Sequence, residues 1–540
     1  SETGSVKTSG KWMFGILNKG DDNAITVNGD VITTGSSARA INSQGNRNTI
    51  TLNGNITTGV KGKAPNSSSP IDAIGIETSG GDNKIIVSGS ITTHSKSSDG
   101  ILTKFNTDRG DIDEPIEILL KSGSEIITKG YRSHGIRHFD YHPREARRKI
   151  TLEKGSTIST EYNNSVGIYN TNNNDTIIYG DVKTAGNEAH GVQNKSVNNT
   201  VELYGTIVTG DKGSPTKGKK AYGITNEDGS DVLIGSTAGN NGTIITYGNG
   251  SYGIKNECRT AGCKYTINIE NGAGIQTSGS DAHGVYIEHN GAETTVAGNI
   301  STSGERSYGV YNKGNGNTTV VEEDGTINIG NSGGNDAVGV YNNGDKNTTT
   351  VSGEIRTGEE DEINQEINVK SYGVYNNGDA NLTTVSSNGQ IITWGGSAHA
   401  ILNEGTNNIA TVFGGITTYG LNSAGIWNEP GSSEKTTIAL GGKITTTGKN
   451  SSGIYNLSQG NESIIAGMIA TKGDGAYGIF NLGKGNQNNI SGMVVTSGEN
   501  ADGIRNDGED NLTYINTSDR SVGGVYTSGT ESNGVHNIGV

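Results

Sequence analysis

The feature that most constrains this chain is a repeat that returns every 25 to 35 residues along its whole length. Each copy is anchored by a small residue, then Ile or Val, then a variable residue, then in most copies Asn. Similarity at such a period is typical of solenoids, in which each repeat packs only on its neighbours. The nineteen anchors begin at Gly15, Ala40, Gly75, Gly100, Gly135, Gly167, Gly191, Gly223, Gly253, Gly284, Gly309, Gly339, Gly373, Ala400, Gly425, Gly453, Gly478, Gly503 and Gly534.

Each copy divides into three short segments of alternating apolar residues, separated by turns rich in Gly, Asp and Asn. The anchor is the first segment. The second resembles residues 48–54, in which Ile50 and Leu52 share one face. The third has the pattern Gly-x-Ile/Val-x-Thr, as at Ile355 and Thr357. Such alternation over three or four residues indicates short strands. Three strands cannot close a core alone, so each is expected to pair with its equivalent in the next copy. This predicts an all-β, right-handed parallel β-helix of about 19 coils.

The composition agrees with a thin core. Only 30% of the 540 residues are hydrophobic and 86 are Gly, which is too polar for one large globular core. A solenoid needs only a narrow core, which a column of Ile, Val and Thr side chains can fill. We therefore expect one β-helix domain over residues 1–540, with inserted loops near 60–72, 104–116, 137–149, 211–220, 257–264 and 358–369.

The anchor Asn residues are expected to stack in a structural ladder. Equivalent positions lie above one another in a solenoid, so their amides can hydrogen-bond along the axis. We further expect the Gly residues to supply positive φ at tight corners. The Asn residues concerned are Asn170, Asn194, Asn226, Asn256, Asn312, Asn342, Asn376, Asn403, Asn428, Asn456, Asn481 and Asn506.

The repeat resembles the passenger domains of bacterial type V autotransporters, which carry units of the form hGIyNsGsnNtItvsGtItTsG. The resemblance covers essentially the whole chain. It implies a secreted protein of the bacterial cell surface with an adhesive or self-associating role. It does not identify a receptor or a sugar, although host or matrix glycans are a candidate partner.

Several functions are disfavoured by the sequence. The formal net charge is −15 and no basic stripe is visible, so we expect no nucleic-acid partner. No run of about 18 apolar residues exists, so no membrane-spanning segment is expected. The calcium-binding nonapeptide of β-roll proteins does not recur. We expect no cofactor, no metal site and no enzymatic activity.

Two inserted stretches carry reactive residue types. A polysaccharide lyase on this fold would need a basic residue, and a glycoside hydrolase would need paired carboxylates. No neighbouring insertion clearly supplies the additional catalytic residue that such an enzyme would need, so a charged surface loop is the favoured interpretation of the first stretch. A carbohydrate-active enzyme and a phage fibre remain alternatives. The other stretch contains the triplet Arg109-Gly110-Asp111, which is of the type that integrin-like receptors bind. The residues of the first stretch are His138, Asp140, His142, Arg144, Arg147 and Arg148.

An aromatic column is the best functional candidate. The residue after the anchor Ile or Val should point away from the core, because strand side chains alternate. An exposed aromatic stripe could stack sugars or pack against another copy. The alternative is that the stacked rings only reinforce the fold. From Gly284 onward this position is occupied by Tyr286, Tyr311, Tyr341, Tyr375, Leu402, Trp427, Tyr455 and Phe480.

The cysteines and the chain ends give two more expectations. Cys258 and Cys263 are close enough in sequence to form a disulfide, and a surface location is oxidising. Residues 4–8 fit the third strand of a copy, and residues 534–537 fit the first. The two ends are thus complementary in phase. This fits either a fragment of a longer solenoid or head-to-tail stacking into an open filament.

Overall fold

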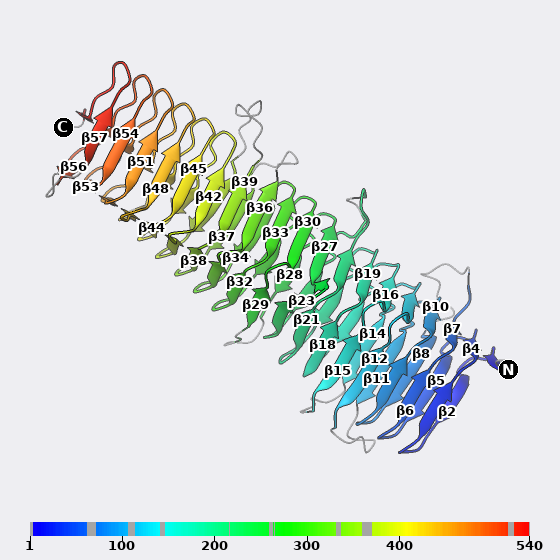
Figure 1. The fold of residues 1–540 in the computed structure, drawn as a ribbon. Coiled ribbons are helices and arrows are strands. Elements are labelled where there is room, and N and C mark those ends of the chain that lie inside the picture. The colour runs from blue at the N-terminus through cyan, green and yellow to red at the C-terminus, as the bar shows by residue number, and fades with distance from the viewer. Residues whose placement is uncertain are drawn as a thin grey trace. The chain divides into compact units, whose positions relative to one another are not determined.

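The structure, a computed structural model, describes residues 4–61, 72–105, 114–140, 146–214, 217–258, 263, 265–330, 336–358, 370–431, 433–516 and 523–538. Within these residues the chain is a parallel β-solenoid of about 18 coils, with three strands per coil and no helix. It divides into two compact units, unit 1 (Ser1–Gly279) and unit 2 (Ser280–Val540). Figure 1 shows the strands of successive coils stacked side by side within each unit. The predicted parallel β-helix is confirmed, with about 18 coils where 19 were expected.

The anchor strands of unit 1 are β2 (Phe14–Asn18), β5 (Arg39–Gln44), β8 (Ile74–Ser79), β11 (Ile101–Phe105), β14 (Ile136–Asp140), β17 (Ile168–Asn170), β20 (Val192–Asn194), β23 (Ile224–Asn226) and β28 (Ile254–Asn256). The second strands are β3 (Ala24–Val27), β6 (Thr49–Leu52), β9 (Lys84–Val87), β12 (Ile116–Leu120), β15 (Arg148–Leu152), β18 (Asn174–Ile178), β21 (Thr200–Leu203), β24 (Asp231–Ile234) and β29 (Thr266–Ile269). The third strands are β1 (Ser5–Thr8), β4 (Asp30–Thr33), β7 (Asn55–Thr58), β10 (Ser90–Thr93), β13 (Glu125–Thr128), β16 (Thr157–Thr160), β19 (Asp181–Thr184), β22 (Thr206–Thr209), β27 (Thr243–Tyr247) and β30 (Gly274–Ser278). A small antiparallel hairpin is formed by β25 (Ser236–Thr237) and β26 (Asn240–Asn241).

The anchor strands of unit 2 are β31 (Val285–Ile287), β34 (Tyr308–Asn312), β37 (Val338–Asn343), β40 (Tyr372–Asn377), β43 (Ile401–Glu404), β46 (Ile426–Asn428), β49 (Ile454–Asn456), β52 (Ile479–Asn481), β55 (Ile504–Asn506) and β58 (Val535–Asn537). The second strands are β32 (Glu293–Val296), β35 (Thr318–Val321), β38 (Thr348–Val351), β41 (Leu382–Val385), β44 (Ile409–Val412), β47 (Lys435–Ile438), β50 (Glu462–Ile465), β53 (Gln487–Ile490) and β56 (Leu512–Ile515). The third strands are β33 (Asn299–Ser303), β36 (Thr326–Gly330), β39 (Glu354–Thr357), β42 (Gln390–Thr393), β45 (Gly415–Thr418), β48 (Lys443–Thr446), β51 (Met468–Thr471), β54 (Met493–Thr496) and β57 (Gly524–Thr527).

Within each unit the strands that form the coils pair in parallel with their equivalents in the next coil, as the repeat predicts. Strand β37 pairs with β40 so that Val340 lies beside Val374 and Asn342 beside Asn376. Alternate residues are buried in all three strand types, and Ile355 of β39 is fully buried. The core is therefore a column of small β-branched side chains with the same residue type in coil after coil. The first and last described strands, β1 and β58, are a third strand and an anchor strand, as expected from the sequence.

The predicted Asn ladder is present in both units. In unit 2 the Nδ2 of Asn312 donates to the Oδ1 of Asn342 at 2.8 Å, and Asn342 donates in turn to Asn376 at 2.8 Å. The series continues through Asn403, and in the same way to Asn537. In unit 1 it runs from Asn170 through Asn194 and Asn226 to Asn256. Because Asn both donates and accepts, one residue type can bond to its own copy in each coil of these two series.

A second Asn ladder, which the sequence reasoning missed, lies at the turn before the second strand. Here the backbone N–H of one coil donates to the Asn side chain of the next. Asn317 donates to Asn347, and Asn347 donates to Asn381, at 2.7 and 2.8 Å. The third corner is closed by the last Thr of the third strand, as where Thr446 donates to the carbonyl of Ser451 at 2.7 Å. Two of the three corners thus satisfy buried backbone groups with short polar side chains, and at the anchor corner the Asn side chains bond to one another.

Most glycines are needed because a side chain at their position would collide with neighbouring atoms, and fewer are needed for a positive φ. A Cβ on Gly309 would lie 2.3 Å from the Cγ2 of Ile327 and 2.6 Å from the carbonyl oxygen of Gly339. The anchor must therefore be small because two sheets approach closely there. The expectation of positive φ holds for turn glycines such as Gly378, with φ of 146°. Many corners instead place Asp, Asn, Ser, Lys or Arg at positive φ, including Asn422 at 53°.

The predicted loop insertions each include residues that lie outside the described part of the chain, namely 62–71, 106–113, 141–145, 215–216, 259–262, 264 and 359–369. That the two units form one domain stays a prediction.

We expect substitution of Asn342 by Ala to destabilise unit 2 strongly. The change leaves the buried amide of Asn312 and the buried carbonyl of Asn376 without their ladder partner, at a cost of roughly 2 to 4 kcal/mol. Urea unfolding followed by tryptophan fluorescence measures the effect, because Trp394 and Trp427 both lie in unit 2. The exposed Asn388→Ala is the matched control. Equal midpoints for the two variants would contradict a stabilising ladder.

Candidate functional site

The aromatic column predicted from the sequence exists, and all of it lies in unit 2. The strand register places each member beside the next, from Tyr286 against Tyr311 to Tyr455 against Phe480. The rings of Tyr341 and Tyr375 are parallel within 10° at 4.7 Å, and those of Trp427 and Tyr455 within 6° at 4.1 Å. The remaining contacts in register join Tyr311, Tyr341, Tyr375, Leu402 and Trp427.

The expectation that the column faces solvent holds only in part. Tyr286, Leu402 and Phe480 are 8%, 5% and 9% exposed, so they are buried. Tyr311, Tyr341, Tyr375, Trp427 and Tyr455 are partly exposed.

A second set of rings covers the column, and we name it the corner column. It occupies the position just before the anchor and includes His283, Tyr308, Tyr372, His399 and Tyr477. His283 stacks on Tyr308 at 4.6 Å, and Tyr308 meets Tyr311 edge to face at 5.3 Å. The alternation of strand side chains gave no signal for these contacts, because the two positions meet only across the bend at the strand start.

The hydroxyl groups of the column are held by the coil that follows. Asn343 donates to the Oη of Tyr311 at 2.9 Å, and Asn377 donates to the Oη of Tyr341 at 3.2 Å. The hydroxyl of Tyr375 donates to a carboxylate oxygen of Glu404. Burial raises the pKa of Tyr341, and burial together with Glu404 raises the pKa of Tyr375. The hydroxyls of Tyr341 and Tyr375 are therefore un-ionised at neutral pH, and all three hydroxyls are held in direction by their hydrogen bonds.

The histidines of the corner columns are structural acceptors. In unit 2, the Nδ1 of His283 accepts the backbone N–H of Tyr308 at 3.1 Å, and the Nδ1 of His399 accepts that of Ala424 at 2.9 Å. In unit 1, His134 and His190 make the same bond to the next coil. Each ring is thus neutral with its proton on Nε2. Burial lowers the pKa of each of these four histidines to about 3.

The orientation of the rings determines which kind of partner surface the column can bind. Stacking uses the ring faces of Tyr311, Tyr341 and Tyr375 within the column, and their edges and fixed hydroxyls remain at the surface. An edge array of this kind suits packing against a second flat surface, since stacking of a sugar on a ring needs an open face.

The described residues of the reactive stretch are tied into the fold of unit 1. His138 is fully buried beside Thr103, with which its Nδ1 forms a hydrogen bond. Arg148 is fully buried and pairs with Asp140. Arg147 pairs with Asp175 of the next coil. His142 and Arg144 lie outside the described residues, as do Arg109, Gly110 and Asp111. The described residues therefore show structural partners at this place.

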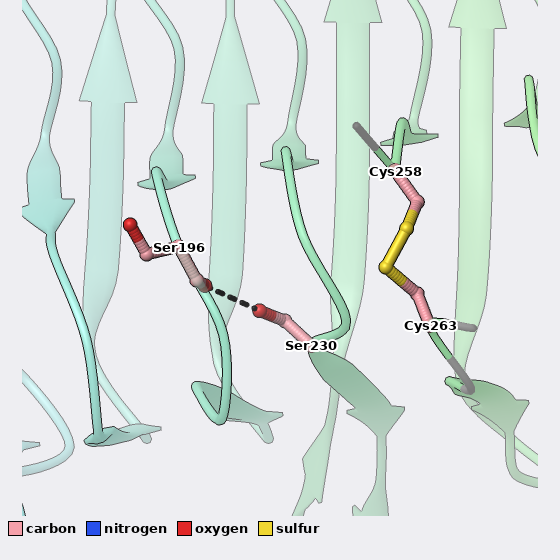
Figure 2. The surroundings of a disulfide bond; sticks show 4 residues. All are labelled: Ser196, Ser230, Cys258 and Cys263. Carbon is pink, nitrogen blue, oxygen red and sulfur yellow. Dashed lines mark hydrogen bonds between the residues drawn. A yellow bond between two sulfur atoms is a disulfide. The ribbon is translucent and has the colours of Figure 1, made fainter. Parts of the chain in front are cut away.

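The structure joins Cys258 and Cys263 in a disulfide, with the two Cα atoms 6.4 Å apart. Figure 2 shows it beside the turn of the preceding coils, where the Oγ of Ser230 donates to the carbonyl of Ser196 at 3.4 Å. The bond links the segment after β28 to the segment before β29. A carboxylate oxygen of Asp228 lies within 4.8 Å of both sulfurs, but disulfide-bonded sulfurs are not thiolate ligands for a metal.

These features define a parallel β-solenoid protein with interlocked aromatic columns. Comparisons of the chain with protein-family models, with curated proteins and with solved structures found no match. Across the described ranges, no helix is long and apolar enough to cross a membrane.

The histidine pKa values predict acid sensitivity. The folded pKa of about 3 lies below the ordinary value of 6.5, so the unfolded chain binds more protons between these limits. Stability should be complete above pH 6.5 and fall progressively as the pH drops toward 3. Substitution of His283 and His399 by Tyr, the residue at the equivalent position in other coils, should flatten this fall in unit 2. Thermal unfolding followed by circular dichroism from pH 7.5 to 4.5 measures it. The same pH slope in both proteins would count against the assignment.

The disulfide should be intact in protein purified without reductant. Intact mass after alkylation should show no modified thiol before reduction and two after it. The enclosed loop is short, so replacing Cys258 and Cys263 by Ser should cost only about 2 kcal/mol. Two alkylated thiols in the unreduced protein would contradict the bond.

Proposed function

We propose that this chain is a non-enzymatic, secreted bacterial surface protein that associates through the aromatic column of unit 2. The observation that carries the proposal is the column itself, in which the rings of three adjacent coils and, beyond the buried Leu402, of two more remain partly exposed: Tyr311, Tyr341, Tyr375, Trp427 and Tyr455. Monomeric proteins seldom expose aromatic side chains in a continuous array without an interaction partner.

The occupant favoured by the geometry is a second copy of the same chain packed alongside. The hydroxyls of Tyr311 and Tyr341 are fixed by Asn343 and Asn377, so little side-chain freedom is lost when a partner surface docks. A repeating surface also presents the same residue spacing to its copy, which lets many equivalent weak contacts form together. The extracellular location and the adhesive role rest on the resemblance to autotransporter passenger domains.

Replacing Tyr311, Tyr341 and Tyr375 with Ser should abolish concentration-dependent association. The rings also stack on one another, so this variant should lose some thermal stability as well. A triple Phe variant keeps the stacking rings and should associate nearly as well as the unchanged chain. Sedimentation velocity over a range of concentrations measures association.

The matched control removes a stacked pair outside the column, Trp394 and Tyr419, whose centroids are 5.5 Å apart. Replacing both with Ser should leave association unchanged. A chain that stays monomeric at every concentration, and whose binding to immobilised glycans is also unaffected by the Ser variant, would overturn the proposal. Binding of glycans that depends on the column, without self-association, would instead identify it as an adhesive surface.

A further inference from the structure

We propose that unit 1 carries a binding slot for a single neutral pyranose ring of a glycan, at a gap in its corner column next to Val166. This site is separate from the aromatic column of unit 2 and does not depend on its function.

The gap arises from one residue. In successive coils the corner column of unit 1 contains His134, Val166, His190, Tyr222 and Tyr252. The backbone bonds confirm that these coils are adjacent, since Gly167 donates to the carbonyl of His190 and Gly191 to that of Tyr222. Four of the five side chains are rings, and the fifth, Val166, is a smaller, buried side chain that lines a hollow between them.

The rings beyond the gap are stacked in order. His190 lies parallel to Tyr222 within 5° at 4.8 Å, and Tyr222 to Tyr252 within 12° at 5.0 Å. Tyr222 therefore covers one face of His190, and the other face is directed toward the coil of Val166. On the far side of the gap, Tyr169 leans on His134 with centroids 5.3 Å apart. His190 is only partly exposed, and it is the ring that lines the hollow on the side of Tyr222.

A hollow of about 360 Å³ opens at this place. That volume lies at the lower end of the range for small-molecule sites, so it suits one sugar ring better than a long oligosaccharide segment. In unit 2 the same space is taken up by Tyr311 and Tyr341 against Tyr308. In unit 1 the coil of Val166 has Tyr169 at the position of Tyr311, but the next coil has Gln193 where unit 2 has Tyr341, and Gln193 lines the hollow. The hollow is lined by His134, Asn164, Val166, Glu188, His190, Gln193, Lys195, Lys220 and Tyr222.

The chemistry of the lining favours a sugar over an aromatic side chain. Asn164, Glu188 and Lys220 form one rim at equivalent turn positions of three successive coils, each with φ near 50° to 55°. They supply amide, carboxylate and ammonium groups that can bond the hydroxyls of a pyranose, whose C–H face can stack on His190. A phenyl ring would desolvate these polar groups without replacing their hydrogen bonds.

The charges indicate a neutral sugar. Lys195 is paired with Glu227, and the rim adds one cation, Lys220, and one anion, Glu188. His190 is neutral because its Nδ1 accepts the N–H of Tyr222 and its Nε2 carries the proton. The local charge therefore sums to about zero, so the slot has no excess of cations to select a uronate or a sulfated sugar.

The test uses saturation-transfer-difference NMR of the full chain with methyl α-glucopyranoside, methyl α-mannopyranoside, methyl α-galactopyranoside and methyl N-acetyl-β-glucosaminide. At least one glycoside should be saturated by the unchanged protein. Val166→Tyr places in the gap the residue found at Tyr222 and Tyr252, so it should fold normally and abolish that signal. Gln193→Tyr fills the hollow from the other side and should do the same. Gln193→Tyr is the variant to rely on if Val166→Tyr alters the circular dichroism spectrum.

The matched control is Ser159→Tyr, which adds a tyrosine to the outer face of β16 away from the hollow and should keep the signal. p-Cresol is the aromatic probe. No saturation of any glycoside, a signal that survives both filling variants, or saturation of p-cresol alone would overturn the proposal. A glycoside signal lost in the Tyr311, Tyr341 and Tyr375 variant, but kept in Val166→Tyr, would place the sugar on the unit 2 column and overturn this inference while supporting the proposed function.

Discussion

The constraint on which the structure depends is that polar groups buried at the corners are paired, mainly with the equivalent group of the next coil. Parallel stacking brings the same position into register coil after coil, so a residue type is tolerated there only if it can bond to a copy of itself or to the neighbouring backbone. Asn meets both conditions, and the contact from Asn342 to Asn376 is the typical bond. Without such ladders the narrow interior would carry many unpaired amides and carbonyls.

The places where the ladder changes support this interpretation. In the coils of β14 and β15 the two Asn positions hold His138 and Arg148. Both are fully buried, and each has its own partner, Thr103 for the histidine and Asp140 for the arginine. Larger polar groups are thus accepted where a dedicated partner replaces the repeated amide. The sequence favoured a charged surface loop for this stretch, which is wrong for His138 and Arg148, because both are buried inside the coil and have structural partners there.

The same register that builds the core also builds the surface columns. A residue that points outward is repeated at the coil spacing of about 4.8 Å, which is close to the stacking distance of aromatic rings. Tyr341 and Tyr375 stack at 4.7 Å for this reason, and His190 and Tyr222 stack at 4.8 Å. A column of rings is therefore stable by itself, and a single small residue such as Val166 creates a ring-sized space. Both proposed interaction sites follow from this geometry, one from continuity of a column and the other from its interruption.

The sequence by itself determined the repeat, the three strands of each coil, the parallel pairing and the anchor Asn ladder. It also placed Tyr286 to Phe480 in one column, because these properties depend only on spacing and on the alternation of strand side chains. It failed to show the second Asn ladder, the corner column and the burial of Tyr286 and Phe480. Those depend on how the chain bends where a turn meets a strand, which brings His283 and Tyr308 over positions that alternation alone assigns to solvent. The tertiary structure also decided that the anchor glycines are required by the approach of Ile327 and similar residues, since a contact between two sheets leaves no mark in the local sequence.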